Sequence, residues 1–178
     1  MSLSWIPNAI TGLRMLLAPP LARLIIDGRH AEALWLAAFA GLSDAADGLL
    51  AKRYGWTSRL GGLLDPIADK LMLLACFVAL GIGDELPAWL VWLVVGRDAL
   101  IVAGALAYHR LVGALQAAPS SLSKVTTVFQ IVLVLLVLFD GLHAVSLPGW
   151  VLAGAIGLVA ALTLASGLHY AIVWSAKA

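Results

Sequence analysis

The sequence predicts an all-α integral membrane protein with six transmembrane helices and both termini in the cytoplasm. Of its 178 residues 62% are apolar and only 12% are charged, and the mean hydropathy is +1.00. A water-soluble domain of this size could not bury so much apolar surface, so the surrounding solvent must be lipid. This composition excludes a soluble enzyme and a disordered chain. The net charge of +1 offers no basic surface to nucleic acid.

Six apolar stretches are long enough to cross a bilayer, which takes roughly 20 helical residues. They are residues 9–26, 33–51, 60–80, 88–108, 122–139 and 147–173. Pro19 and Pro20 should kink or end the first stretch, since neither donates a backbone hydrogen bond. No soluble domain or repeat interrupts the series, so we expect one transmembrane domain over residues 1–178.

The charges between the stretches predict the orientation, because cytoplasmic loops carry an excess of Lys and Arg. With the N-terminus inside, the outside loops hold a single cation, Arg29. The inside segments hold five, namely Lys52, Arg53, Arg59, Arg110 and Lys177. Both termini and residues 52–59 should therefore face the cytoplasm. No organelle-targeting segment is recognisable, so we expect a bacterial inner membrane.

Four acids lie within or beside the second and third stretches, and each costs about 2.5–3.5 kcal/mol at membrane depth. They are Asp44, Asp47, Asp65 and Asp69. Spacings of three and four place each pair on one helix face, and the short connection makes the two helices antiparallel neighbours. Facing carboxylates repel unless they are protonated, paired with cations or bound to a divalent metal. Because Mg²⁺ takes carboxylate and phosphate oxygens, the pattern predicts a phosphate-handling metal site.

The residues around these acids have a specific order. They read Asp44-Ala-Ala-Asp47-Gly48-Leu-Leu-Ala51-Lys52 and then Gly61-Gly-Leu-Leu-Asp65-Pro-Ile-Ala-Asp69. Residues 44–69 closely resemble the signature of the CDP-alcohol phosphotransferases, D-x2-D-G-x2-A-R followed by G-x3-D-x3-D. Lys52 stands where the family usually has Arg, which keeps the charge but loses the planar fork. Residues 8–14 also resemble the N-x2-T-x2-R stretch that opens the first helix of many members.

The resemblance implies a membrane enzyme in which a hydroxyl attacks the β-phosphoryl of a CDP-linked donor and CMP leaves. It implies a two-metal site for Mg²⁺ or Mn²⁺ held by Asp44, Asp47, Asp65 and Asp69, with Asp69 also accepting the proton of the acceptor. The residues it assigns to CDP binding are Asp44, Gly48, Ala51, Lys52, Gly61 and Asn8. It further implies a homodimer with one site in each protomer, open to the cytoplasmic face.

Two later segments indicate the acceptor. Arg97-Asp98 resembles the Arg-acid pair of the phosphatidylglycerol-phosphate and cardiolipin branches, and we expect these adjacent side chains to diverge. Residues 123–130 read S-K-V-T-T-V-F-Q, which resembles the CMP-forming cardiolipin synthases. Phosphatidylglycerol-phosphate synthases commonly read G-K-x-K-T there, so Thr126 replaces a lysine. We therefore expect transfer from CDP-diacylglycerol to phosphatidylglycerol, giving cardiolipin, with Arg97 and Lys124 binding the acceptor phosphate.

Other interpretations remain open. Within the same family, glycerol 3-phosphate as acceptor would give phosphatidylglycerol phosphate. Outside it, acids in a membrane also mark ion paths, so a cation or proton transporter is an alternative, although these acids cluster near one side. Arg14, Lys70, Arg97 and Lys124 would be buried by sequence, where they could also pair with the acids or snorkel. Gln130 could form a hydrogen bond between helices.

Overall fold

The computed structural model describes residues 6–54, 61–111, 120–143 and 147–175, and the side chains within 12–43, 67–104, 120–143 and 147–172. The described residues form α-helices and no strands. The helices are α1 (Ile6–Ile26), α2 (His30–Tyr54), α3 (Gly61–Ile82), α4 (Ala88–Leu111), α5 (Ser121–Asp140) and α6 (Gly149–Ser175). Each predicted stretch overlaps one helix, so the all-helical fold is confirmed.

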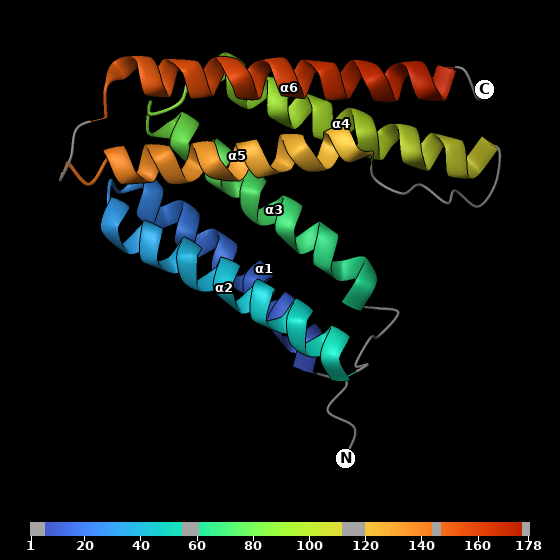
Figure 1. The fold of residues 1–178 in the computed structure, drawn as a ribbon, viewed down its shortest axis with the longest axis horizontal. Coiled ribbons are helices and arrows are strands. Elements are labelled where there is room, and N and C mark those ends of the chain that lie inside the picture. Colours follow the sequence, from blue (N-terminus) through green and yellow to red (C-terminus); the bar gives the residue numbers. More distant parts are fainter. Residues whose placement is uncertain (1–5, 55–60, 112–119, 144–146, 176–178) are drawn as a thin grey trace. The chain divides into compact units, whose positions relative to one another are not determined.

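The chain divides into two compact units. The first comprises Met1–Glu85 with Leu138–Val145, and therefore holds α1, α2, α3 and the end of α5. The second comprises Leu86–Val137 with Ser146–Ala178, and holds α4, most of α5 and α6. Figure 1 draws both units, and each is described here by itself.

In the first unit α1 packs against both α3 and α2. Figure 1 shows that α2 runs opposite to α1 and α3, so the C-terminal end of α2 and the N-terminal ends of α1 and α3 lie at the same end of this unit. The side chains with almost no exposed surface include Leu21 and Ile25 of α1 and Phe77 and Leu80 of α3. Large apolar side chains of α1 and α3 are thus withdrawn from the surface.

In the second unit α4 packs against α6, and α5 runs antiparallel to α6 in Figure 1. Side-chain hydrogen bonds join α5 to α6: the Thr126 hydroxyl lies 3.3 Å from the carbonyl oxygen of Leu162, and Gln130 Nε2 donates to Thr163 Oγ1 at 3.4 Å. The interhelical hydrogen bond predicted for Gln130 is confirmed. Polar groups therefore contribute to the packing of α5 with α6.

Two helices of the first unit are each followed by a turn in which one residue adopts the left-handed conformation. After α1, the amide of Gly28 donates to Ile25 O (2.9 Å) and the amide of Arg29 donates to Leu24 O (2.9 Å). Gly28 has φ +69°, the left-handed conformation that this capping motif requires. After α3, Asp84 takes the left-handed position with φ +57° instead of a glycine. The turn presents Glu85, whose Oε2 lies 2.8 Å from Nε2 of His30 at the start of α2.

The expectation that Pro19 and Pro20 could end the first helix is wrong, because α1 continues through both to Ile26. Each proline removes a backbone donor, but the flanking Ala18 and Leu21 are buried and both proline rings lie on the exposed side. Packing of the buried side therefore outweighs the local cost, as it commonly does in membrane helices.

Two described helical segments are long and apolar enough to cross a membrane, Ser121–Asp140 and Gly149–Ile172. Large apolar side chains also remain exposed on other helices, including Trp35 (78%) on α2 and Trp92 (73%) on α4. Such surfaces suit lipid better than water. The six spans and the cytoplasmic termini remain predictions.

Candidate active site

The four acids of the signature lie on two helices of the first unit. Asp44 and Asp47 belong to α2, and Asp65 and Asp69 belong to α3. The C-terminal end of α2 and the N-terminal end of α3 lie at the same end of the unit (Figure 1). Among the side chains that the structure describes, no group of three or more His, Cys, Asp or Glu residues is arranged to hold a metal ion. The side chains of Asp44, Asp47 and Asp65 lie outside that part of the chain.

The residues predicted to bind CDP are all in helices of this unit. Asn8 lies on α1, Gly61 begins α3, and the others lie on the C-terminal half of α2: Gly48, Ala51 and Lys52. Their side chains are outside the described ones. The role of each in CDP binding stays a prediction.

Asp69 forms an ion pair with Arg14, which lies 55 residues earlier on α1. Its Oδ1 accepts a hydrogen bond from Nη1 of Arg14. The arginine side chain is 4% exposed, whereas that of Asp69 is 51% exposed. The carboxylate that the resemblance assigns to proton transfer is thus half exposed, and its partner in the ion pair is a buried guanidinium. The prediction that Arg14 pairs with one of the acids is confirmed.

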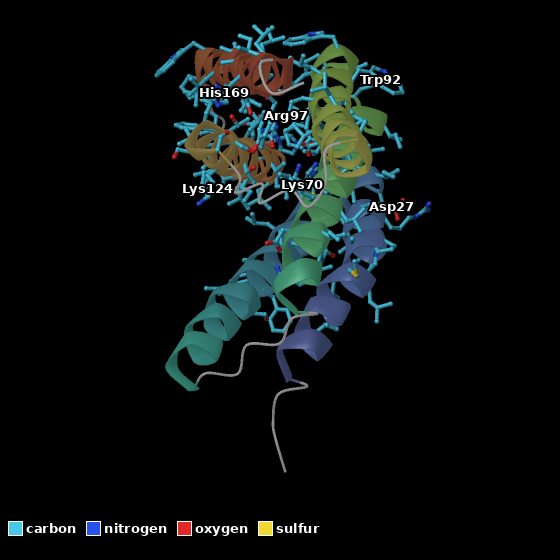
Figure 2. The ribbon with its side chains drawn as sticks, turned by 90° about the vertical axis from the view of Figure 1, so that its right-hand side faces the viewer. Asp27, Lys70, Trp92, Arg97, Lys124 and His169 are labelled. Atoms are coloured by element: carbon cyan, nitrogen blue, oxygen red, sulfur yellow. The ribbon has the colours of Figure 1, made fainter. Side chains whose placement is uncertain are left out.

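Arg97 lies in the second unit, within α4, and only 5% of it is exposed. Its Nη2 donates to Ser123 Oγ on α5 at 2.8 Å and to Ser166 Oγ on α6 at 2.5 Å. Its Nη1 donates to Asp98 Oδ1 at 2.6 Å. Figure 2 shows Arg97 among the side chains that lie between α4, α5 and α6. The guanidinium is therefore held by one carboxylate and by hydroxyls from two other helices.

Two expectations about these residues are wrong. The side chains of Arg97 and Asp98 do not diverge, because the long arginine side chain reaches across to its neighbour on the same helix. Lys124 is not buried: it is exposed, and in Figure 2 it projects from the side of α5 away from Arg97. The reason is its position next to Ser123, about 100° around α5 from the face that Ser123 presents to Arg97. The structure brings Arg97 together with the serines and not with Lys124.

The sequence interpretation missed Ser166, which reaches Arg97 from α6. It also missed the polar face to which Ser166 belongs. On α6, Thr163 and Ser166 are fully buried at 0% exposure, although that helix is otherwise strongly apolar. A usable signal was present, because Thr163, Ser166 and Tyr170 are spaced by three and four residues and so share one helix face.

The sequence profile of the CDP-alcohol phosphatidyltransferase family matches residues 4–169. The chain belongs to this family. The match covers both units, including the signature acids of α2 and α3 and the Arg97 cluster of α4, α5 and α6. The family resemblance of the signature at residues 44–69 is thereby confirmed.

The chain is similar to several curated members of the family. It is 39% identical over 98 residues to the probable cardiolipin synthase (CMP-forming) of Drosophila melanogaster, covering 54% of this chain and 30% of that protein. It is 32% identical over 145 residues to the human cardiolipin synthase (CMP-forming), covering 72% of this chain and 48% of the human one.

A third similar protein carries a different name. It is the chloroplastic CDP-diacylglycerol–glycerol-3-phosphate 3-phosphatidyltransferase 1 of Oryza sativa, 32% identical over 195 residues, with 94% of this chain and 56% of that protein covered. The chain spans about half the length or less of these relatives. The family profile and the names of these relatives agree on the CDP-alcohol phosphatidyltransferase family, and two of the three relatives are named cardiolipin synthases.

Proposed function

We propose that the protein transfers a phosphatidyl group from CDP-diacylglycerol to a hydroxyl of phosphatidylglycerol, giving cardiolipin and CMP. The observation that carries the proposal is the arrangement of the signature. Its acids belong to two helix ends that share one end of the first unit, and Asp69 keeps half of its side chain exposed there. A carboxylate so exposed beside a buried guanidinium is suited to meet a substrate hydroxyl.

The donor set of the signature fits a divalent metal. Four carboxylates at the same end of the first unit supply only oxygen ligands, which hard cations prefer, and gathered together they would repel one another without a cation. Asp44, Asp47, Asp65 and Asp69 would hold two Mg²⁺ or Mn²⁺ ions. Bound there, the ions would neutralise the diphosphate and stabilise the charge that builds on the departing phosphate.

The protein's own groups would carry the proton and orient the donor. The acceptor oxygen forms a bond to the β-phosphorus, the bond from that phosphorus to CMP breaks, and Asp69 takes the hydroxyl proton. Lys52 would contact the diphosphate, and Gly48, which has no Cβ, would let the cytidine or its phosphate approach the helix backbone. Asn8, Ala51 and Gly61 complete the proposed CDP-binding set, together with Asp44.

Arg97 and Lys124 are the proposed contacts of the acceptor phosphate. Arg97 is a buried guanidinium with a carboxylate and two hydroxyls on its terminal nitrogens, and its Nε is buried without a hydrogen-bond partner among the described atoms. A buried N–H without a partner is costly, and a phosphate oxygen would satisfy it. Lys124 is exposed and carries its charge on a long flexible side chain, so its contact would form only when the acceptor is present.

Thr126 favours phosphatidylglycerol over glycerol 3-phosphate. It stands where phosphatidylglycerol-phosphate synthases commonly have a second lysine, which would suit a small dianion. Here the side chain is fully buried, and its Oγ1 lies 2.8 Å from Leu122 O and 3.3 Å from Leu162 O. Thr126 therefore serves helix packing and adds no positive charge, which supports the monoanionic phosphodiester of phosphatidylglycerol as acceptor.

The setting of the reaction is also part of the proposal. Residues 1–178 would act as a single transmembrane domain of six spans in a bacterial inner membrane, with the site facing the cytoplasm, and the protein would form a homodimer. The two long apolar helices and the membrane lipids named for its relatives support the membrane setting.

An acceptor assay tests the function. The purified protein in detergent or lipid receives CDP-diacylglycerol and Mg²⁺ or Mn²⁺ with either phosphatidylglycerol or glycerol 3-phosphate, while CMP and lipid products are measured. The proposal predicts CMP with cardiolipin from phosphatidylglycerol alone. Turnover with glycerol 3-phosphate alone would assign the protein to phosphatidylglycerol-phosphate synthesis. Turnover with neither, together with no metal-dependent CMP binding, would favour the transporter.

A further inference from the structure

Polar side chains lie between α5 and α6 in a row that is buried except at Tyr170, and this row is here called the polar seam. Its members on each helix are spaced by three and four residues, so each set lies along one helix face. The seam consists of Ser123, Thr126 and Gln130 on α5 and of Thr163, Ser166 and Tyr170 on α6. Ser123, Thr126, Gln130, Thr163 and Ser166 are at most 7% exposed.

Two neighbouring hydroxyls of α6 differ in what they contact. Thr163 Oγ1 accepts from Gln130 at 3.4 Å, which is a contact between α5 and α6 alone. Ser166 Oγ, one turn further on, accepts from Arg97 Nη2 at 2.5 Å. The next residue, Gly167, also lies near this arginine, because a Cβ added there would be in ordinary contact with Arg97 Cγ at 3.6 Å. Of the two hydroxyls, only that of Ser166 makes a hydrogen bond to the guanidinium of Arg97 within the described part of the chain.

From these contacts we infer that Ser166 is a positioning residue that orients Arg97 for the acceptor phosphate. The inference rests on the proposed function, in which Arg97 binds that phosphate. A guanidinium is a rigid planar group, so fixing Nη2 between Ser166 and Ser123 fixes the directions of its remaining N–H groups. A hydroxyl does this without cancelling charge, unlike a second carboxylate beside Asp98. Asp98 offsets part of the charge of Arg97, and the serine hydroxyls offset none of it, so Arg97 keeps part of its attraction for an anion while its orientation is set.

The remaining donors of Arg97 indicate where the anion would bind. Of its five N–H groups, two on Nη2 donate to serines and one on Nη1 donates to Asp98. The groups left are on Nη1 and on Nε, and Nε is buried without a partner among the described atoms. Loss of the Ser166 contact would let the guanidinium rotate and misdirect these donors.

The test compares Ser166→Ala with Thr163→Val, since each removes one buried hydroxyl from the same face of α6 and only the first touches Arg97. The KM values for phosphatidylglycerol and CDP-diacylglycerol, kcat and thermal stability are measured for both. Ser166→Ala should raise the KM for phosphatidylglycerol about tenfold and leave that for CDP-diacylglycerol unchanged. Thr163→Val should lower stability and leave both KM values within about twofold. Ser166→Thr, which keeps the hydroxyl, should restore the acceptor KM.

A second arm asks whether Ser166 acts through Arg97. In an Arg97→Lys background, Ser166→Ala should raise the acceptor KM no further, because the guanidinium that it orients is absent. The inference would be overturned if Ser166→Ala raised the acceptor KM by the same factor with Arg97→Lys as without it. It would also be overturned if Ser166→Ala changed both KM values equally, or if it lowered only the stability, as expected for Thr163→Val. A wild-type protein silent with both acceptors would instead overturn the proposed function, and this inference with it.

Discussion

The two units meet the cost of buried basic groups in different ways. In the first, the buried Arg14 on α1 pairs with Asp69 on α3, 55 residues later in the sequence. In the second, Arg97 takes Asp98 from its own helix and neutral hydroxyls from α5 and α6. Each buried arginine thus pairs with a carboxylate of the described residues, which comes from a helix distant in sequence in the first unit and from the same helix in the second, where two hydroxyls are added.

This difference bears on what each unit can bind. The first unit carries the four acids of the signature, so it is suited to hold cations. A hydroxyl satisfies an N–H without cancelling its charge, so Arg97 keeps part of its attraction for an anion. We connect the first behaviour with the CDP-linked donor and its metals, and the second with the acceptor phosphate.

The largest expected loss of activity comes from replacing an acid of the first unit. Asp69→Asn removes the proposed proton acceptor, so CMP release should fall roughly 10³-fold, within the range that a positioned general base contributes. Asp27→Asn is the control, because Asp27 also pairs with an arginine of α1 but lies exposed at the other end of that helix. Turnover of Asp69→Asn above a tenth of wild type would remove Asp69 from the mechanism.

Removal of the divalent metal should also abolish the activity that depends on the acids of the first unit. Turnover after treatment with EDTA should fall by at least about a hundredfold, since the diphosphate charge would then meet the carboxylates without compensation. Added Mg²⁺ or Mn²⁺ should restore it, and EDTA already saturated with Mg²⁺ should do nothing. Full activity in the chelator would contradict the metal role of Asp44, Asp47, Asp65 and Asp69.

Replacing the buried Arg97 and the exposed Lys124 of the second unit should raise the KM for phosphatidylglycerol by different amounts. Arg97→Gln should raise the KM for phosphatidylglycerol about a hundredfold, because the hydrogen bonds of a buried charged group are lost. Lys124→Gln should raise it less, about tenfold at low salt, with the effect shrinking as salt screens the exposed charge. Equal effects with equal salt dependence would contradict the distinction between the two cations.

A smaller effect concerns stability alone. A Cβ at Gly141 would lie 2.5–2.8 Å from ring atoms of His30, so Gly141→Ala must displace the ring that pairs with Glu85. We expect a loss of about 1–3 kcal/mol in the free energy of unfolding, measured by denaturant titration in detergent. Gly154→Ala on α6 is the control, since no atom lies within 4 Å of an added Cβ, and it should lose no stability and gain up to about 1 kcal/mol because alanine is the better helix former.

The sequence predicted the helices and the family because both depend on local or repeated patterns. Apolar length identified the six helices, and the spacing of Asp44, Asp47, Asp65 and Asp69 identified the signature, which the family match supports. Hydropathy gives no account of packing, however. The continuation of α1 through Pro19 depends on burial of the opposite side of that helix.

The acceptor region was harder to predict for a physical reason. A serine in an apolar helix is typical of close helix packing, so Ser166 carries no signal of its own. Its contact with Arg97 depends on how α6 is rotated against α4, which three-dimensional packing decides. The exposure of Lys124 follows in the same way from the face that α5 buries. A neutral hydrogen-bond partner of Arg97 that is distant in sequence, such as Ser166, produces no charge pattern from which the contact could be predicted.

The transfer of the β-phosphate tests the central claim most directly. CDP-diacylglycerol carrying a radioactive β-phosphate is incubated with the protein, phosphatidylglycerol and Mg²⁺, and the label is followed into lipid and water-soluble products. Phosphatidyl transfer predicts that all released CMP is unlabelled and that the label enters cardiolipin in equal molar amount. Label released in water-soluble CDP, or CMP formed with no label in a new lipid, would contradict the account.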